Sequence, residues 1–366
     1  MYDVRTQDGE KAVRELSASS QSVTLYFTRL TVSEDGVYLP LPAERFEEFS
    51  AVALEIPSVR GILDAYSSCL SIDLLQEMQH PHSSGIDRRI LETGMYAAFA
   101  FYLEARFGLR PRALSFYSSG VAPALIFSES ISPIGYLENL APFHSANRHA
   151  YVAVERCLSI AQTRLEAEPD EDIEAFVETL LKESGGGHSV FIKDRRHKHT
   201  LLVAGEKEAI ALVRERVGEA FPSVARRAPK LVDTSSAHLP LYDRAPLEEV
   251  LSHVAFDRPR FKLIGIDGDS VEAGCASQGD LRRLVHRAAF GFMDTGRVVR
   301  KASADADRLI VVGSPFGARV LDRTHLGGFL KAELATSYVA EQMQRTTVEA
   351  LDNSRARLGE NGGSQC

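Results

Sequence analysis

SFYSSGVAPALIFS, residues 115–128, places two adjacent serines and a glycine between an expected strand and an expected helix. A strand that turns sharply into a helix with serine at the bend is how many acyl-transferring enzymes expose their nucleophile. Such bends normally carry a glycine two residues before the serine, and here Phe116 stands two residues before Ser118. Serine also commonly caps a helix. Taken alone, the stretch leaves both interpretations open.

The segments around this stretch predict a parallel α/β sheet. Residues 87–109 read as a helix with a broad apolar face, and residues 112–118 read as a buried strand that leads into the serines. Residues 22–30, 261–267 and 307–315 have the β-branched and apolar content of further strands. Ligand sites of such sheets gather at the carboxyl ends of the strands, and Ser118 is expected at one of these ends.

The middle of the chain predicts a second, smaller sheet. Strands and helices alternate there in the β-α-β-β-α-β order of a ferredoxin-like fold. We therefore expect an α/β protein with a large α/β-hydrolase-like domain and an inserted small subdomain. The predicted limits are 22–154 and 234–330 for the large domain, 155–233 for the subdomain, and 331–366 for a C-terminal helix and disordered tail.

Composition narrows the class of protein. The 366 residues are 44% hydrophobic, enough for a sizeable core, and the net charge of −8 argues against a nucleic-acid partner. The four cysteines show no metal-ligand spacing, and we expect no metal site and no bound cofactor because no nucleotide-binding glycine motif occurs. No apolar stretch is long enough to span a bilayer, so the expectation is a soluble, cytoplasmic protein without a membrane partner.

A serine nucleophile needs a base, most often histidine. His238, in VDTSSAHLPL (232–241), follows the last expected strand of the small subdomain, where the chain returns to the large domain. Such a crossing point lies beside the cleft between domains. Ten other histidines occur in the chain, and only this position singles out His238.

Several segments, in their order, resemble the malonyl-CoA:acyl-carrier-protein transacylase family of fatty-acid and polyketide synthesis. HTLLVAGEKEAI (199–210) is similar to that family's strand-glycine-helix segment, and SSAHLPL (235–241) to its catalytic-histidine segment. FKLIGIDGD (261–269) and DRLIVVGSPFGARVL (307–321) are similar to the later strands and the closing glycine-containing loop. The resemblance covers about residues 22–322.

The resemblance implies a role for each matching residue. The family's GHSxG motif falls on residues 116–120, which makes Ser118 the nucleophile and the backbone N–H of Ser119 an oxyanion donor. His238 becomes the base. Its second ring nitrogen is expected to be oriented by a backbone carbonyl, placed at about Met293.

The chain also departs from the family pattern. FTRL (27–30) has Arg29 where the family's oxyanion-hole glutamine falls, and Val121 replaces an acidic residue. Phe116 and Tyr117 are expected to border the acyl group. Arg148 is the nearest match to the arginine that pairs with dicarboxylic acyl groups, although reaching it requires an insertion of about five residues.

These features predict a stand-alone acyltransferase. Ser118 would take an acyl group from a coenzyme A or carrier-protein thioester and pass it to the phosphopantetheine thiol of an acyl carrier protein. An editing hydrolase of the same fold and an inactive scaffold that binds a carrier protein remain alternatives. The basic run KDRRHKH (193–199) suits either a docking rim for acidic partners or a solvated hairpin.

Overall fold

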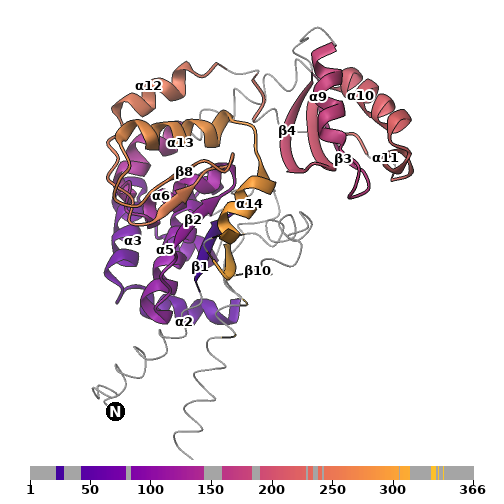
Figure 1. Cartoon of the computed structure of the whole chain (residues 1–366). Helices are drawn as coiled ribbons and strands as arrows, with labels where there is room; N and C mark the ends of the chain where they lie inside the picture. The colour runs from indigo at the N-terminus through magenta and orange to yellow at the C-terminus, as the bar shows by residue number, and fades with distance from the viewer. Residues whose placement is uncertain are drawn as a thin grey trace, which may run out of the picture.

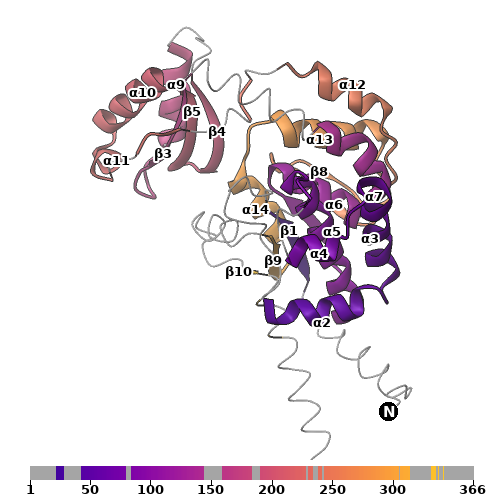
Figure 2. The same cartoon turned by 180° about the vertical axis from the view of Figure 1, so that it is seen from behind.

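The computed structural model describes residues 22–28, 43–79, 84–143, 159–183, 190–227, 230–233, 238–240, 243–304, 306–313 and 331–334, with residues 337 and 341. Within these residues the strands form two separate sheets, one of six strands and one of four. Figures 1 and 2 show the two sheets side by side, with the smaller one standing outside the helices that surround the larger one.

The larger sheet is almost entirely parallel. Its strand order is β10-β9-β1-β2-β7-β8, and the only antiparallel pair that the described residues form in it is β7 with β8. The strands are β1 (Val23–Phe27), β2 (Ala113–Phe116), β7 (Lys262–Ile264), β8 (Ser270–Val271), β9 (Arg308–Val312) and β10 (Lys331–Leu334). The predicted α/β class is thereby confirmed. Strand β10 occupies the start of the stretch 331–366, for which the sequence predicted a helix and a tail, and residues 331–334 pair there with β9.

Helices cover both faces of this sheet. One face packs against the helices of the main core, and the other packs against α14 (Thr295–Ala304) through Val298, Val299 and Ala302. All five residues of β1 are buried as a result, which explains its continuous apolar sequence. The remaining helices of the large domain are α2 (Ala43–Ala53), α3 (Pro57–Leu70), α4 (Leu74–Gln79), α5 (Arg88–Phe107), α6 (Val121–Phe127), α7 (Pro133–Gly135), α12 (Ala245–His253) and α13 (Gln278–Phe290). A π-helical turn, η2 (Tyr136–Leu140), follows α7.

Helix α5 is the central helix of the main core. Asp87 caps its start by accepting a hydrogen bond from the backbone of Arg89, and Gly108 ends it with a φ of 64°. Every residue from Ile90 to Leu103 is buried, so this helix is surrounded on all sides by other elements. It delivers the chain to β2, which lies at the middle of the sheet.

The smaller sheet has the βαββαβ arrangement with strand order β4-β5-β3-β6, and all pairs are antiparallel. Its strands are β3 (Ile160–Glu166), β4 (Val190–His197), β5 (Thr200–Glu206) and β6 (Val232–Asp233). Helices α9 (Ile173–Glu183), α10 (Lys207–Ala220) and α11 (Pro222–Arg226) pack on one face. Strand β6 is only two residues long, and the chain before it forms α11, which begins with a proline. The predicted domain limits stay predictions.

Strand β4 joins the two sheets. It is the strand of the small sheet nearest to the large domain (Figures 1 and 2), and Asp194 forms a parallel bridge with Met293, just before α14. Its pairing with β5 is interrupted by two register shifts, between Ile192 and Asp194 and between Arg195 and His197. Such bulges bend an edge strand and change the direction of its side chains. The second bulge lies at Arg196, beside this junction.

Candidate active site

Ser118 lies at the carboxyl end of β2, where the strand turns into a helix. Strand β2 ends at Phe116, a single 3-10 turn (η1) spans Ser118–Gly120, and α6 begins at Val121. The backbone φ of Ser118 is 51°, a left-handed value that is unfavourable for a residue with a Cβ. The strand, the bend and the strained serine together form the geometry of a nucleophile elbow.

Gly120 allows this bend to pack against the end of β1. A Cβ at this position would lie 2.5 Å from the carbonyl oxygen of Phe27 and 2.6 Å from that of Thr28. Both neighbours are backbone atoms, which cannot move away without shifting β1. The glycine is therefore required by close approach, and it fixes the height of the bend above the sheet.

His238 lies next to Ser118, as the sequence predicted. The distance from its Nε2 to the Oγ of Ser118 is 2.8 Å, and its Nδ1 lies 2.9 Å from the carbonyl oxygen of Gly291. A carbonyl can only accept, so in the neutral imidazole Nδ1 carries the proton and Nε2 accepts the Ser118 O–H. His238 is buried and also has a positive φ, 67°. A hydroxyl, a base and an orienting acceptor thus stand in line, the arrangement that activates a serine.

The prediction of Met293 as the orienting residue is wrong by two positions. The backbone of Met293 is already paired with β4: its N–H donates to Lys193 at 3.0 Å, and its carbonyl accepts from Arg195 at 2.8 Å. Gly291 lies just before this bridge and its carbonyl remains available to His238. The bridge to β4 therefore decides which carbonyl faces the imidazole.

A buried ion pair, Asp194 with Arg196, holds the same segment and was not predicted. Asp194 is fully buried and accepts hydrogen bonds from the backbone N–H of Thr295 at 3.2 Å and from its hydroxyl at 2.7 Å. Arg196 donates from Nε to the other carboxylate oxygen at 3.0 Å. Asp194 thus caps α14 and fixes the chain that carries the Gly291 carbonyl.

The charges of Asp194 and Arg196 interact with tyrosines next to the bend at Ser118. Burial works against the charge of Arg196, but Asp194 and Tyr117 outweigh it, and the pKa of the guanidinium is raised. Burial raises the pKa of Tyr26 well above its usual value, with further contributions from Tyr117 and Asp194. Arg196 therefore stays protonated and the Tyr26 phenol stays neutral, close to the residue that precedes Ser118.

Part of the basic run at 193–199 is directed into the molecule. The side chain of Arg196 is buried with Asp194, and Arg195 turns to the helix side, where it pairs with Glu174 and Glu178 at 2.5 and 2.6 Å. Its guanidinium also lies 4.8 Å from the ring centre of Phe292. Much of the positive charge in this run is thus used within the molecule.

The other predicted site residues have varied surroundings. Phe116 is buried in the main core, Tyr117 is half-buried and packs against the core on both faces of the sheet, and Ser119 is half-buried directly after Ser118. Arg29 and Arg148 lie outside the described residues. No group of three or more metal-ligating side chains occurs in the described part of the chain. Among these residues, too, no helix is long and apolar enough to cross a membrane.

Comparison with known proteins identifies the fold. No protein-family model and no curated protein matches the sequence. Solved structures do match. Malonyl-CoA:acyl carrier protein transacylase (FabD) from Xanthomonas oryzae pv. oryzae has a TM-score of 0.65 at 15% identity, covering 89% of this chain and 98% of that one.

Two further structures have the same fold. A malonyl-transacylase solved with its type II polyketide synthase acyl-carrier protein gives a TM-score of 0.61 at 16% identity, over 88% of this chain and 99% of that one. The acyltransferase domain of the polyketide synthase PpsC of Mycobacterium tuberculosis gives 0.59 at 12% identity, over 87% and 95%. The resemblance predicted from the sequence is confirmed for the fold: this chain is folded like these acyltransferases.

Proposed function

We propose that this protein is an acyltransferase that works through an acyl-enzyme on Ser118, with His238 as general base. The observation that carries the proposal is the 2.8 Å contact between Ser118 Oγ and His238 Nε2 at the end of the central strand β2. The second hydrogen bond of His238, to the Gly291 carbonyl, supports the tautomer that this role needs.

In the first half-reaction Ser118 attacks the carbonyl carbon of an acyl thioester. The hydroxyl proton passes to His238 Nε2 as the Oγ–C bond forms, and the resulting imidazolium is stabilised by the Gly291 carbonyl at Nδ1. When the C–S bond breaks, the same proton passes to the leaving sulfur. The products are a free thiol and an ester on Ser118.

In the second half-reaction another thiol takes the acyl group. His238 accepts the proton of the incoming thiol, whose sulfur attacks the ester carbonyl, and it returns the proton to Ser118 Oγ when the C–O bond breaks. No net proton is consumed. We propose the phosphopantetheine thiol of an acyl carrier protein as the acceptor and a coenzyme A or carrier-protein thioester as the donor. Two structural neighbours support this choice: one is a malonyl-CoA:acyl carrier protein transacylase, and the other is a malonyl-transacylase in complex with its acyl-carrier protein.

The developing oxyanion needs donors, and we propose the backbone N–H of Ser119 as one of them. This residue lies in the 3-10 turn directly after the nucleophile, the place from which nucleophile elbows supply such a donor. Arg29 as a second donor, Arg148 as a carboxylate partner, and Phe116 and Tyr117 as borders of the acyl pocket remain proposals from the sequence.

The decisive test is covalent loading of Ser118. The protein is incubated with a panel of acyl-CoA thioesters, and intact mass is measured for an acyl adduct. Ser118→Ala should abolish the adduct, and Ser119→Ala, the matched change at the next serine, should keep it. His238→Ala should slow loading by about 10⁴-fold or more, as removal of the base does in serine enzymes.

Three outcomes separate the possible functions. Loss of the adduct on adding a carrier protein, with the acyl group on its phosphopantetheine, supports the transferase. Equal loss in buffer alone would mean an editing hydrolase. An adduct that survives Ser118→Ala, or no adduct across the whole panel, would contradict the proposal.

A further inference from the structure

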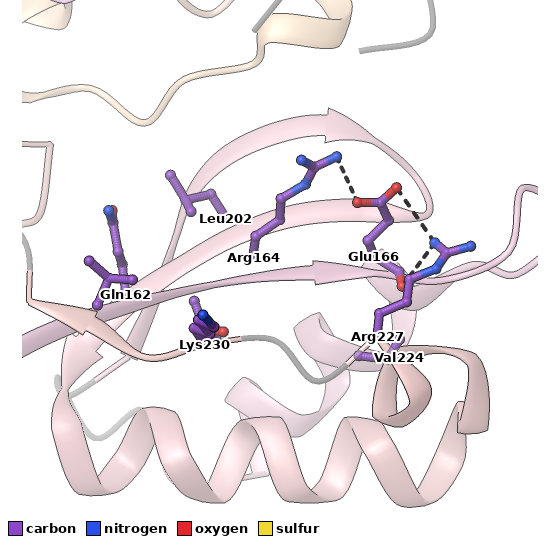
Figure 3. A pocket seen from close by; sticks show the side chains of 9 residues that line it. Gln162, Arg164, Glu166, Leu202, Val224, Arg227 and Lys230 are labelled. Carbon is purple, nitrogen blue, oxygen red and sulfur yellow. Dashed lines mark hydrogen bonds and ion pairs between the residues drawn. The ribbon is translucent and has the colours of Figure 1, made fainter. Parts of the chain in front are cut away.

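The small sheet contains a cavity of about 430 Å³ that the proposed mechanism does not use (Figure 3). It lies along the edge of β3. Strand β6 pairs with β3 only at Ala161 and Gln162, so the edge of β3 from residue 163 onward is left without that partner. Residues from both faces of β3 line the cavity, among them Thr163 on the helix side and Arg164 on the open side. This volume lies within the usual range of small-molecule pockets.

One side of the cavity is strongly basic. Arg164, Arg227 and Lys230 line it together with Glu166, and Glu168 pairs with Arg227 from just outside it, which leaves an excess of one positive charge in a protein whose net charge is −8. Glu166 pairs with Arg164 at 2.7 Å and with Arg227 at 3.5 Å, as the dashed lines in Figure 3 show. Lys230 is exposed and forms no ion pair with the described residues. This wall therefore retains positive charge for an anion.

The guanidinium of Arg227 is held in a fixed place at this edge. It donates to the carbonyl oxygens of Ala167 at 2.8 Å and Glu166 at 3.2 Å, and it pairs with Glu168 at 3.1 Å. These bonds cap the carbonyls at the end of β3. A cation that is already positioned loses little conformational freedom when a ligand binds.

An unsatisfied hydroxyl lines the same cavity. Thr163 is only 1% exposed, and its Oγ1 forms no hydrogen bond with any described residue. A buried polar group without a partner is costly, and a ligand that hydrogen-bonds to it would recover that cost. The hydroxyl is thus a second, independent sign of a ligand at this place.

Apolar side chains form another part of the cavity lining. Leu202, Val224 and Val232 line it, and Val232 is 52% exposed, unusual for a strand valine. These side chains suit a ring or short hydrocarbon part of a ligand. The ligand should therefore carry both an anion and an apolar body.

We propose that this cavity binds an organic phosphate, with the phosphate between Arg164, Arg227 and Lys230 and an attached ring on Leu202 and Val232, which lie on the same open face as Arg164. A tetrahedral phosphate can accept from two guanidinium groups and an ammonium at once, which a planar carboxylate does less well. The Thr163 hydroxyl, on the other face of β3, would hydrogen-bond to a second polar group of the ligand at the free edge of the strand. Nucleotides have this chemistry, and so does the nucleotide end of coenzyme A. The inference goes beyond the proposed function, because it needs neither Ser118 nor His238.

The cavity also lies next to the segment that carries His238. Gln162, which lines the cavity, is paired with Ala204 on β5, and Ala204 packs against Leu239. Leu239 directly follows His238 in the chain. A phosphate ligand here would therefore contact the small sheet one cross-strand row from the catalytic segment.

The test is calorimetric titration of the full chain with three probes: adenosine 3′,5′-bisphosphate, pantetheine 4′-phosphate and inorganic phosphate. The bisphosphate should bind more tightly than inorganic phosphate, because only the former has a ring for the apolar wall. Stronger binding of pantetheine 4′-phosphate than of the bisphosphate would show that the site prefers the pantetheine phosphate to the nucleotide. Ser118→Ala should leave binding of the bisphosphate unchanged, which separates this inference from the proposed function.

Two variants and a matched control locate the site. Lys230→Glu should weaken binding of the bisphosphate by about tenfold or more, the usual effect of losing one charge-assisted hydrogen bond. Lys182→Glu makes the same charge change on α9 of the same subdomain and should have little effect. Thr163→Val should raise the melting temperature of the free protein and reduce the extra stabilisation that the bisphosphate gives.

The opposite results would overturn the proposal. They are no binding of any probe, binding that Thr163→Val and Lys230→Glu both leave unchanged, or equal weakening by Lys182→Glu. Tight binding of inorganic phosphate, equal to that of the bisphosphate, would contradict the role of the apolar wall.

Discussion

In the part of the chain that the structure describes, helices cover both faces of the large sheet but only one face of the small sheet. In the large sheet every residue of β1 and β2 is buried, and Ser118 is held in a strained conformation at the end of this rigid layer. In the small sheet β3 alternates: Leu165 packs under the helices, while Gln162, Arg164 and Glu166 lie on the open side. The closed sheet thus fixes the position of the Ser118 hydroxyl, and the open sheet leaves polar side chains on its uncovered face.

The two sheets are joined by Asp194, and removing its charge should have the largest effect on stability. Asp194→Asn leaves the buried Arg196 without its carboxylate, a change that typically costs about 3–5 kcal/mol. Unfolding in urea, followed by far-UV circular dichroism because the chain has no tryptophan, measures this cost. Loading of Ser118 should also slow, since Asp194 holds the segment of Gly291.

The neighbouring arginine supplies the control for this prediction. Arg195→Gln breaks two ion pairs of the same strand, but their side chains are 24–39% exposed, and such pairs contribute about 0–1 kcal/mol. If Arg195→Gln lowered the free energy of unfolding as much as Asp194→Asn, the buried pair of Asp194 and Arg196 would not be the main link between the sheets.

Gly120→Ala tests whether the closed sheet has room to adjust. The new Cβ would clash with the backbone carbonyl oxygens of Phe27 and Thr28, and overpacking of this kind costs about 3 kcal/mol. Gly61→Ala is the matched change within helix α3, where nothing lies within 4 Å of the new Cβ, and it should stabilise by about 0.5–1 kcal/mol. Urea unfolding of both variants checks the opposite signs. Equal effects would mean that the elbow is not closely packed.

Sequence reasoning succeeded where the signals were local. Helix α5 was predictable because a capping aspartate, an apolar run and a glycine mark its ends, and the structure places them at Asp87 and Gly108. Ser118 and His238 were paired in advance from the order of the segments, and the structure brings them to 2.8 Å. The helix depends on local signals, whereas the pairing of Ser118 with His238 depends on the order of segments that resembles a known family.

The features that the sequence did not predict correctly depend on contacts between distant segments. The carbonyl that orients His238 belongs to Gly291 and not Met293, because a bridge to Asp194 from the small sheet occupies Met293. The burial of Arg196 in the basic run could not be predicted from the sequence either, since it follows from two bulges in β4 that direct Arg196 toward the large domain. Neither bulge has a glycine or proline to mark it in residues 192–197.

Ser118→Gly tests the strain that the closed sheet imposes. A left-handed conformation costs a residue with a Cβ about 1–2 kcal/mol, and glycine loses about 0.5–1 kcal/mol through the entropy of the unfolded chain. Ser118→Gly should therefore be more stable than Ser118→Ala by about 0.5–1 kcal/mol, although both variants lack the hydroxyl. Comparing the two by urea unfolding isolates the backbone effect. A more stable alanine variant would show that the bend stores no strain.

The smallest effect is expected at the exposed end of the open sheet, where Glu171 joins α11 to the chain after β3. Its carboxylate accepts from the hydroxyl of Ser223 at 2.5 Å and from the backbone N–H of Glu168 at 2.7 Å, and these bonds lower its pKa. A carboxyl whose pKa is lower in the folded state stabilises the protein above the pKa of the unfolded chain, about 4.3 for glutamate. This stabilisation is lost as the pH falls through the folded pKa. Glu171→Gln should therefore lower the melting temperature slightly at pH 7 and hardly at all at pH 3, as thermal melts at the two values will measure.

Glu183→Gln, a change at an exposed glutamate at the end of α9, is the control and should show no such difference. An equal loss at both pH values would mean that Glu171 acts through its shape and hydrogen bonds and not through its charge.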